Sequence, residues 1–141
     1  MFKLVKSFRF EAAHRLAKGY PDKCKNIHGH SFSGELVVNC QNLDHFDMGV
    51  DFSVLKNFLS SIESKFDHKL LLYEKDDALI SLCLQQGWEI FTFPKNPTSE
   101  VIAAYIYDEA CLFVKQNNYP CSIKEVRISE TCTSRCHFSR P

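Results

Sequence analysis

The chain has 141 residues, of which 45% are hydrophobic, 13% aromatic and 24% charged. This length and composition predict one domain over residues 1–141 and exclude a disordered or fibrous chain, because there is enough apolar surface to bury a core. Seventeen basic and seventeen acidic residues give a net charge of zero, so the overall field recruits neither nucleic acid nor an anionic membrane, and we expect any anionic partner to be a small molecule.

Residues 2–16 and 28–39 alternate apolar and polar side chains with the two-residue period of a half-buried strand. In both segments the even positions carry the apolar and histidine side chains. These are Phe2, Leu4, Phe8, Phe10, Ala12, His14 and Leu16, and then His28, His30, Phe32, Leu36 and Val38. Gly19, Pro21 and Asp22 lie between the two segments, which are predicted to pair as a hairpin.

From Asp51 to Phe66 the apolar residues recur at steps of three and four, which is typical of an amphipathic helix with Asp51 as its N-cap. A short helix is predicted over residues 77–86, ended by Gly87, and a strand-like segment follows over 88–93.

A further helix is predicted after Asn96-Pro97, with Glu100 in its first turn, and a final strand over residues 123–130. Strands come first, and helices are then mixed with strands. This order favours the α+β class, with an antiparallel sheet and helices packed on one face.

His28-Gly29-His30 is the most informative tripeptide in the chain. Residues two apart on a strand project from the same face, so the two imidazoles can converge on one ion. His14 is the candidate third ligand, because its parity places it on the apolar side of the first strand. Three neutral imidazoles suit Zn²⁺, although histidine pairs at this spacing are also common in proteins without a metal.

Cys24 lies four residues before His28 and has two opposite interpretations. As a fourth ligand it would close a structural metal site. As a free thiol beside a dication it would have a lowered pKa and act as a base or nucleophile next to an open metal position.

Asp67-His68 and Glu130 are the other candidates for chemistry. The first pair either caps the end of a helix or forms a proton-transfer group oriented by a carboxylate. Glu130 shares its parity with Val126 and Ile128, and a carboxylate on that face needs hydrogen-bond donors such as two adjacent N–H groups of a ligand. Alternatively the strand has ended and Glu130 lies in water.

Six motifs extend from the first strand to near the C-terminus. They are Phe10-Glu11-Ala12-Ala13-His14-Arg15-Leu16, Cys24-x-x-x-His28-Gly29-His30-Ser31-Phe32, Asp51-Phe52, Asp67-His68-Lys69-Leu70-Leu71, Asn96-Pro97-Thr98-Ser99-Glu100 and Glu130-Thr131-Cys132-Thr133. This ordered set resembles the 6-pyruvoyl tetrahydropterin synthase superfamily. The three-residue gap between Cys24 and His28 is similar to its carboxy-forming branch, the 6-carboxytetrahydropterin synthases of bacterial queuosine biosynthesis.

The resemblance implies the tunnelling fold, an antiparallel four-stranded sheet with two helices packed on one face. It implies a homo-oligomeric ring, commonly a hexamer, with active sites at subunit interfaces. The implied site residues are the zinc ligands His14, His28 and His30, a catalytic Cys24, the proton relay Asp67 and His68, and a pterin-anchoring Glu130. Thr98 and Ser99 are implied to lie near the pterin pocket of the same or a neighbouring subunit.

The implied reaction converts 7,8-dihydroneopterin triphosphate to 6-carboxy-5,6,7,8-tetrahydropterin and releases acetaldehyde and triphosphate. One rival is the sibling lyase that forms 6-pyruvoyl tetrahydropterin on the same scaffold. A second rival, from another class, is a binding or structural protein whose metal site is closed by Cys24.

The N-terminal residues mix charges with apolar side chains where a signal peptide needs a continuous apolar stretch. No later run approaches the ~18 apolar residues of a membrane span. We therefore expect a cytoplasmic protein with no membrane partner. Seven cysteines are an odd number, and in such a compartment we expect reduced thiols, most of them small buried hydrophobes.

Overall fold

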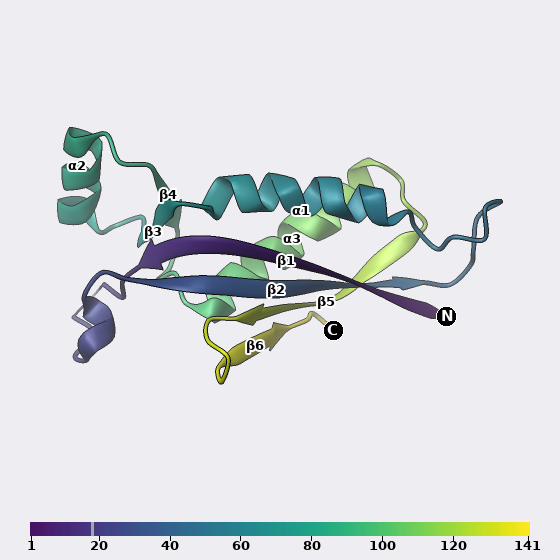
Figure 1. The fold of residues 1–141 in the computed structure, drawn as a ribbon, viewed down its shortest axis with the longest axis horizontal. Helices are drawn as coiled ribbons and strands as arrows, with labels where there is room; N and C mark the ends of the chain where they lie inside the picture. Colours follow the sequence, from purple (N-terminus) through teal and green to yellow (C-terminus); the bar gives the residue numbers. More distant parts are fainter. Residues whose placement is uncertain (18) are drawn as a thin grey trace.

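The computed structural model describes residues 1–17 and 19–141 (Figure 1). In these ranges six strands form one sheet, in the order β4-β3-β1-β2-β5-β6. The strands are β1 (Phe2–His14), β2 (His28–Cys40), β3 (Lys69–Tyr73), β4 (Ile90–Phe93), β5 (Cys121–Ser129) and β6 (Arg135–Phe138). The helices are α1 (Phe52–Phe66), α2 (Asp77–Gln86) and α3 (Ser99–Gln116), with a short 3-10 helix η1 (Lys23–Lys25) before β2.

The predicted hairpin is confirmed. Strands β1 and β2 pair antiparallel along their whole length, with His14 opposite His28 and Ala12 opposite His30. From Phe8 to His14 and along β2, most even-numbered side chains point into the core, where Phe10 and Phe32 are almost fully buried, whereas Phe2 at the start of β1 is half exposed. The alternation predicts this face correctly because one side of the hairpin packs on helices and the other does not.

The expected four-stranded antiparallel sheet is wrong. The described sheet has six strands, and two of its pairings, β1 with β3 and β3 with β4, are parallel. Residues 70–73 of β3 are all buried, so this strand has hydrophobic side chains on both faces and lacks the alternation that reveals a strand. Strand β6 has only four residues at the sheet edge, too few for a clear period.

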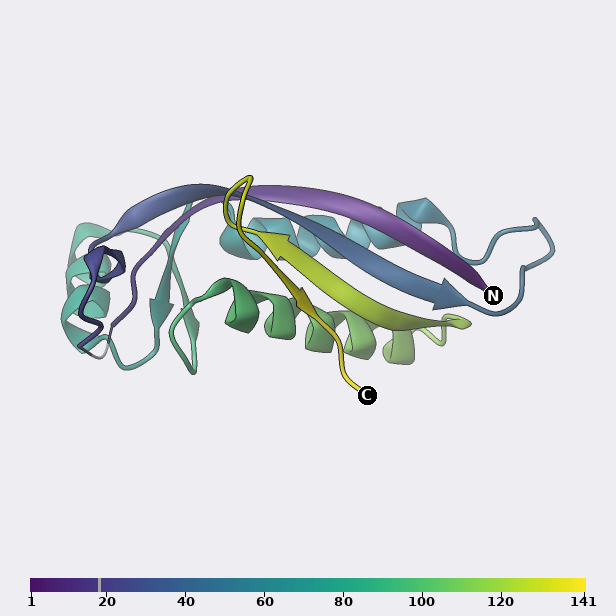
Figure 2. The ribbon, with the colours of Figure 1, turned by 90° about the horizontal axis from the view of Figure 1, so that it is seen from below.

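Helices α1 and α3 lie on the same side of the curved sheet, as predicted (Figure 2). Asp51 caps α1 through the hydrogen bond that its Oδ1 accepts from the backbone N–H of Ser53 at 2.7 Å. Helix α1 buries side chains such as Leu55 and Phe66 in the main core. His14 and His28 lie opposite each other at the end of the hairpin. This end lies next to the start of α3, because His14 contacts the carbonyl of Pro97.

Helix α2 has the predicted bounds and ends at Gly87, whose φ of 70° is the left-handed conformation that favours glycine. Its Leu79 and Cys83 pack in a small cluster with Leu70 and Leu72, whereas Leu71 belongs to the main core. Successive residues of a strand point to opposite faces, so α2 covers the face of β3 that lies away from α1 and α3. Within the described residues, the expectation of two helices on one face is therefore corrected to three α-helices on two faces.

No helix in the described ranges combines the length and apolar character needed to cross a membrane.

Candidate metal centre and proton-transfer pair

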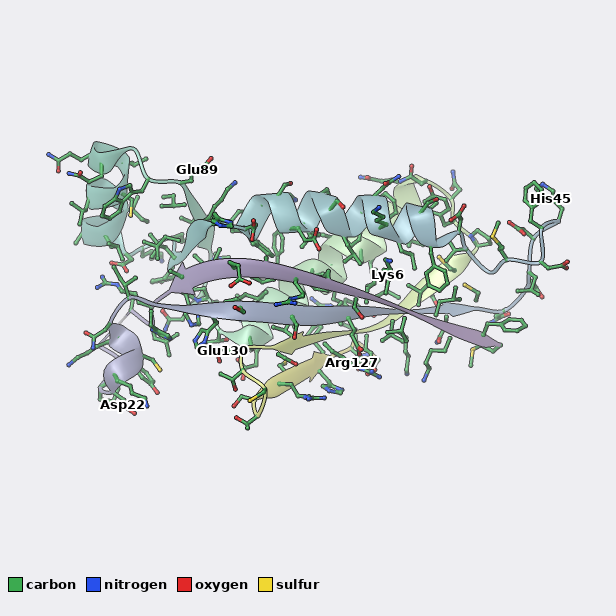
Figure 3. All side chains as sticks on the ribbon, viewed as in Figure 1. Lys6, Asp22, His45, Glu89, Arg127 and Glu130 are labelled. Carbon is green, nitrogen blue, oxygen red and sulfur yellow. The ribbon has the colours of Figure 1, made fainter. Side chains whose placement is uncertain are left out.

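The imidazoles of His14, His28 and His30 meet the carboxylate of Glu130 at one end of the hairpin. Each of the four side chains offers a ligand atom, and these atoms all lie within 4.8 Å of one another. His14 ends β1 and His28 begins β2 directly opposite it. Glu130 follows the last residue of β5, next to β2 (Figure 3). The sheet register therefore brings together three residues from the predicted zinc site and the predicted pterin anchor.

His14 shows why this group suits a cation. Its Nδ1 lies 2.7 Å from the carbonyl oxygen of Pro97, and because a carbonyl only accepts, Nδ1 carries the proton and Nε2 of the neutral ring has a free lone pair. That Nε2 lies 3.0 Å from Oε1 of Glu130. Two acceptor atoms at this distance repel each other unless a cation lies between them, either a proton on the imidazole or a metal ion.

The burial of His14 favours a metal ion over a proton as the cation between Nε2 and the carboxylate. The side chain of His14 is only 3% exposed, and desolvation by burial lowers the pKa of His14, although the Pro97 carbonyl and the Glu130 carboxylate oppose this shift. The neutral imidazole is therefore favoured, which is the form that binds metals. The buried Nε2 atoms of His14 and His30 both lack a hydrogen-bond partner, because their approaches to Glu130 fall within ion-pair distance without hydrogen-bond geometry. These atoms fit a metal ion.

His28 is oriented in the same way as His14. Its Nδ1 lies 2.8 Å from the backbone oxygen of Asn26, so Nδ1 donates and Nε2 is left to bind an ion. For His14 and His28, a backbone carbonyl behind the imidazole sets the tautomer and the ring orientation, which is the usual outer shell of a histidine metal site.

The carboxylate of Glu130 is the unexpected member of the group. Its parity predicts the face of Val126 and Ile128, and the contacts with His14 and His30 place it on that side. The side chain of Glu130 is 28% exposed, so it is neither in bulk water nor fully buried. Sequence reasoning did not identify the histidines as its neighbours.

Cys24 lies in η1 and is half-buried. Its backbone oxygen accepts a hydrogen bond from the N–H of Leu16 at 2.8 Å, which ties η1 to the chain leaving β1. The thiol is not a member of the metal-binding group found among the described residues. The fourth side chain in that group is Glu130, so the structure gives no support to a metal site closed by Cys24.

Asp67 and His68 form an oriented pair at the end of α1. Nδ1 of His68 lies 2.7 Å from Oδ2 of Asp67, and the His68 side chain is 79% exposed. Hydrogen bonds from Glu11 and His68 lower the pKa of Asp67, the Glu11 backbone N–H being the larger cause. The helix-capping interpretation also holds in part, because the backbone N–H of Asp67 donates to the backbone oxygen of Glu63 at the end of α1. The imidazole, however, bonds the carboxylate and leaves Nε2 exposed.

A cleft of about 780 Å³ lies beside His68, and His30 is the one residue of the metal-binding group that also lines it. His68 and His30 both line it, together with Ile27, Lys69 and Trp88. No hydrogen bond or ion pair between described residues joins His68 to the metal-binding group itself. The cleft, and Trp88 in particular, was not predicted as part of the site, because a single tryptophan just before β4 carries no functional pattern.

Thr98 and Ser99 lie at the start of α3. Oγ1 of Thr98 accepts the backbone N–H of Val101 at 3.4 Å, so Thr98 is the N-cap and Ser99 is the first helical residue. The adjacent Pro97 carbonyl is the acceptor that orients His14. The two residues are thereby held next to the metal centre, but the structure shows no role for them beyond the cap.

Residues 3–141 match the family model of 6-pyruvoyl tetrahydropterin synthase. The chain belongs to this family. The pterin synthase family resemblance seen in the six motifs is thus confirmed, and the chain is an enzyme rather than a purely structural or binding protein.

The chain is similar to curated proteins that are named 6-carboxy-5,6,7,8-tetrahydropterin synthase. One from Rickettsia typhi is 33% identical over 129 residues, covering 88% of this chain and 92% of the relative. One from Synechocystis sp. is 34% identical over 146 residues and covers 100% of this chain and 95% of the relative.

Solved structures show the same fold in the pterin synthase family. An uncharacterized protein from Wolinella succinogenes superposes with a TM-score of 0.85 at 18% identity, covering 99% of this chain and 98% of that one. The 6-pyruvoyl tetrahydropterin synthase of Caenorhabditis elegans superposes with a TM-score of 0.70 at 21% identity, covering 99% and 96%.

Proposed function

We propose that this chain is a zinc-dependent 6-carboxy-5,6,7,8-tetrahydropterin synthase in queuosine biosynthesis, acting on 7,8-dihydroneopterin triphosphate and releasing acetaldehyde and triphosphate. The observation that carries the proposal is the pair of acceptors, His14 Nε2 and Glu130 Oε1, that face each other at 3.0 Å in a group of four metal-binding side chains. The names of the curated relatives support the carboxy-forming reaction.

His14, His28 and His30 would hold the zinc ion, since three neutral imidazoles match its ligand preference and leave a fourth position. When bound, zinc supplies Lewis acidity that polarises the oxygens of the pterin side chain. The chain's own contribution is to orient two of the imidazoles, because the carbonyls of Pro97 and Asn26 hold the Nδ1 atoms of His14 and His28 and leave each Nε2 atom turned toward the group.

Cys24 would remove a proton from carbon, and His68 with Asp67 would relay protons on the other side of the substrate. His68 is suited to this task because Asp67 fixes Nδ1 and leaves Nε2 exposed in the cleft that His30 also lines. The relay would act on the substrate of the same or a neighbouring subunit of a homo-oligomer, for which the family expectation is a hexamer.

Glu130 would anchor the pterin through two hydrogen bonds from the amino group and ring N–H edge of the substrate. Thr98 and Ser99 would line the same pocket from the start of α3, where the Pro97 carbonyl already contacts His14. The proposed partner is thus a small pterin triphosphate, with no nucleic acid or membrane, handled by one cytoplasmic domain.

A product assay tests the proposal. Zinc-loaded protein is incubated with 7,8-dihydroneopterin triphosphate, and acetaldehyde and 6-carboxytetrahydropterin are quantified, with His28→Ala as the inactive control. Acetaldehyde in equal amount to the carboxypterin is expected. Formation of 6-pyruvoyl tetrahydropterin without acetaldehyde would establish the sibling reaction, and no turnover by the zinc-loaded protein would overturn the proposal.

A further inference from the structure

We propose that Glu130 has two successive partners: it is the fourth protein ligand of the metal in the substrate-free enzyme, and a bound pterin draws it away. The same carboxylate then closes the metal site in the free enzyme and binds the pterin ring in the complex. Binding of the substrate therefore frees the fourth coordination position of the metal. This inference rests on the proposed function for the identity of the metal and of the substrate class.

The first support is distance. Oε1 of Glu130 lies 3.0 Å from Nε2 of His14 and 3.2 Å from Nε2 of His30. Ligand atoms that are bonded to a tetrahedral zinc ion at about 2.0–2.1 Å stand about 3.3 Å from one another. A single oxygen atom therefore meets two of the three imidazoles at nearly the separation that a shared ion imposes.

The second support is the hydrogen-bond inventory of the group. The Nε2 atoms of His14 and His30 are buried, and neither has a hydrogen-bond partner. The Pro97 carbonyl holds the single proton of the neutral His14 ring on Nδ1. A carboxylate oxygen placed against the lone pair of His14 Nε2 gains nothing from it directly, and the contact is stabilised by a cation that both atoms share.

The third support is the freedom of Glu130 to leave. It is the first residue beyond β5, and its backbone N–H is held by the oxygen of Ser134 in the turn before β6. Its side chain is partly exposed, unlike that of His14. Rotation about its χ angles therefore moves the carboxylate out of the group while the backbone stays in place.

A metal with four protein ligands is closed, which is typical of structural zinc, whereas catalysis needs an open position. Two adjacent N–H donors on a pterin offer Glu130 a bidentate, charge-assisted arrangement in exchange for the metal. The exchange couples the two events, because the ring cannot bind this carboxylate without freeing the fourth position. An enzyme without substrate would thus keep its metal shielded.

The experiment uses full-length protein loaded with Co²⁺, whose visible absorption reports coordination number, and compares wild type, Glu130→Gln and the control Glu74→Gln. Glu74 is exposed, and its only described hydrogen bond is through the backbone. The wild type and the control are expected to show the intense bands of four-coordinate cobalt, and Glu130→Gln the weaker bands of a site entered by water. Zinc affinity, measured by chelator competition, should fall at least tenfold in Glu130→Gln alone. Circular dichroism checks that each variant is folded.

The release step is tested with neopterin, a fully oxidised pterin without the phosphate chain, whose binding is followed by calorimetry. Bound neopterin should change the cobalt spectrum of the wild type. Identical cobalt spectra and zinc affinities in the wild type and Glu130→Gln would overturn the closed site even if the product assay succeeds. A wild-type spectrum unchanged by bound neopterin would overturn the release. Failure of neopterin to bind at all would contradict both the release and the proposed substrate class, while the first comparison still decides the closed state.

Discussion

Oδ2 of Asp67 lies 2.7 Å from Nδ1 of His68, while Oδ1 of the same carboxylate accepts the backbone N–H of Glu11 at 2.8 Å. The backbone N–H of His68 in turn donates to the oxygen of Glu11 at 2.7 Å. These bonds hold His68 at a positive φ of 57°, a conformation that few residues with a side chain adopt. An exposed imidazole is thereby fixed to β1, which a simple helix cap would not require.

Asp67→Asn should lower turnover by about 10²- to 10⁴-fold and leave the melting temperature nearly unchanged. The amide oxygen can still accept from Glu11, but the amide NH₂ facing Nδ1 of His68 forces the ring proton onto Nε2. Steady-state kinetics and thermal melting, with the exposed Asp47→Asn as control, measure both effects. Unchanged turnover would mean that the pair only ends the helix.

His28→Ala and His30→Ala should each lose zinc and activity together, because two imidazoles and a carboxylate hold the ion less well than the complete group. Mass spectrometry of metal content per chain, after dialysis against a weak chelator, gives the readout. His45→Ala is a suitable control, since His45 is exposed in the loop before α1 and far from the group in Figure 3. Full zinc occupancy in either ligand variant would remove that residue from the metal site.

Arg15→Ala should destabilise the fold more than Asp76→Asn. Nε and Nη2 of Arg15 contact the two carboxylate oxygens of Asp76 at 2.7 and 2.5 Å. The side chain of Asp76 is only 6% exposed and that of Arg15 is 30% exposed. Removal of the arginine strands a buried charge, at about 3–5 kcal/mol, whereas an unpaired Arg15 reaches water and the loss is about 1–3 kcal/mol.

Urea unfolding at neutral pH measures the difference between the Arg15 and Asp76 variants. The exposed pair Arg140 and Asp108 supplies a control, in which Arg140→Ala should destabilise the fold far less than Arg15→Ala, because water screens an exposed ion pair. Equal losses for Arg15→Ala and Asp76→Asn would show that the Asp76 carboxylate is solvated in solution.

Cys121 should make the fold less stable in alkali. Burial, with a smaller effect of the facing Cys40, raises the pKa of the Cys121 thiol to about 11, whereas an unfolded chain releases this proton near pH 8.5. The folded state therefore binds more protons than the unfolded state across this interval, and the free energy of unfolding falls as pH rises from about 9 to 11.

Urea unfolding between pH 8 and 10.5 should show a shallower pH dependence for Cys121→Ser than for the wild type. The control Cys132→Ser, at an exposed position, should follow the wild type. Parallel profiles for all three proteins would mean that the Cys121 thiol ionises normally in the folded state. Of the seven cysteines only Cys40 and Cys83 are fully buried, so the expectation that most of them are buried is wrong.

Alternation of side chains was enough to predict the β1–β2 hairpin and the common face of His14, His28 and His30, because the two-residue period and the metal ligands belong to the same pair of strands. Alternation could not predict β3, because this strand is buried on both faces and its side chains therefore do not alternate between apolar and polar. Glu130 was predicted on the correct face without its partners. Those partners depend on β5 lying beside β2, a pairing between distant segments that no local pattern encodes.

The three imidazoles come from the first thirty residues, and His14 and His28 are direct partners at the end of the hairpin where the chain turns back. A metal ion bound by these imidazoles would cross-link the hairpin while the chain that forms α1, α3 and β5 is still being synthesised. Metal binding would then offset part of the entropy lost when the loop between His14 and His28 closes. If the metal binds this early, the concentration of free metal in the cell would affect how fast the chain folds. Chains made under metal starvation would complete the hairpin late and spend longer with two unpaired strands exposed to aggregation.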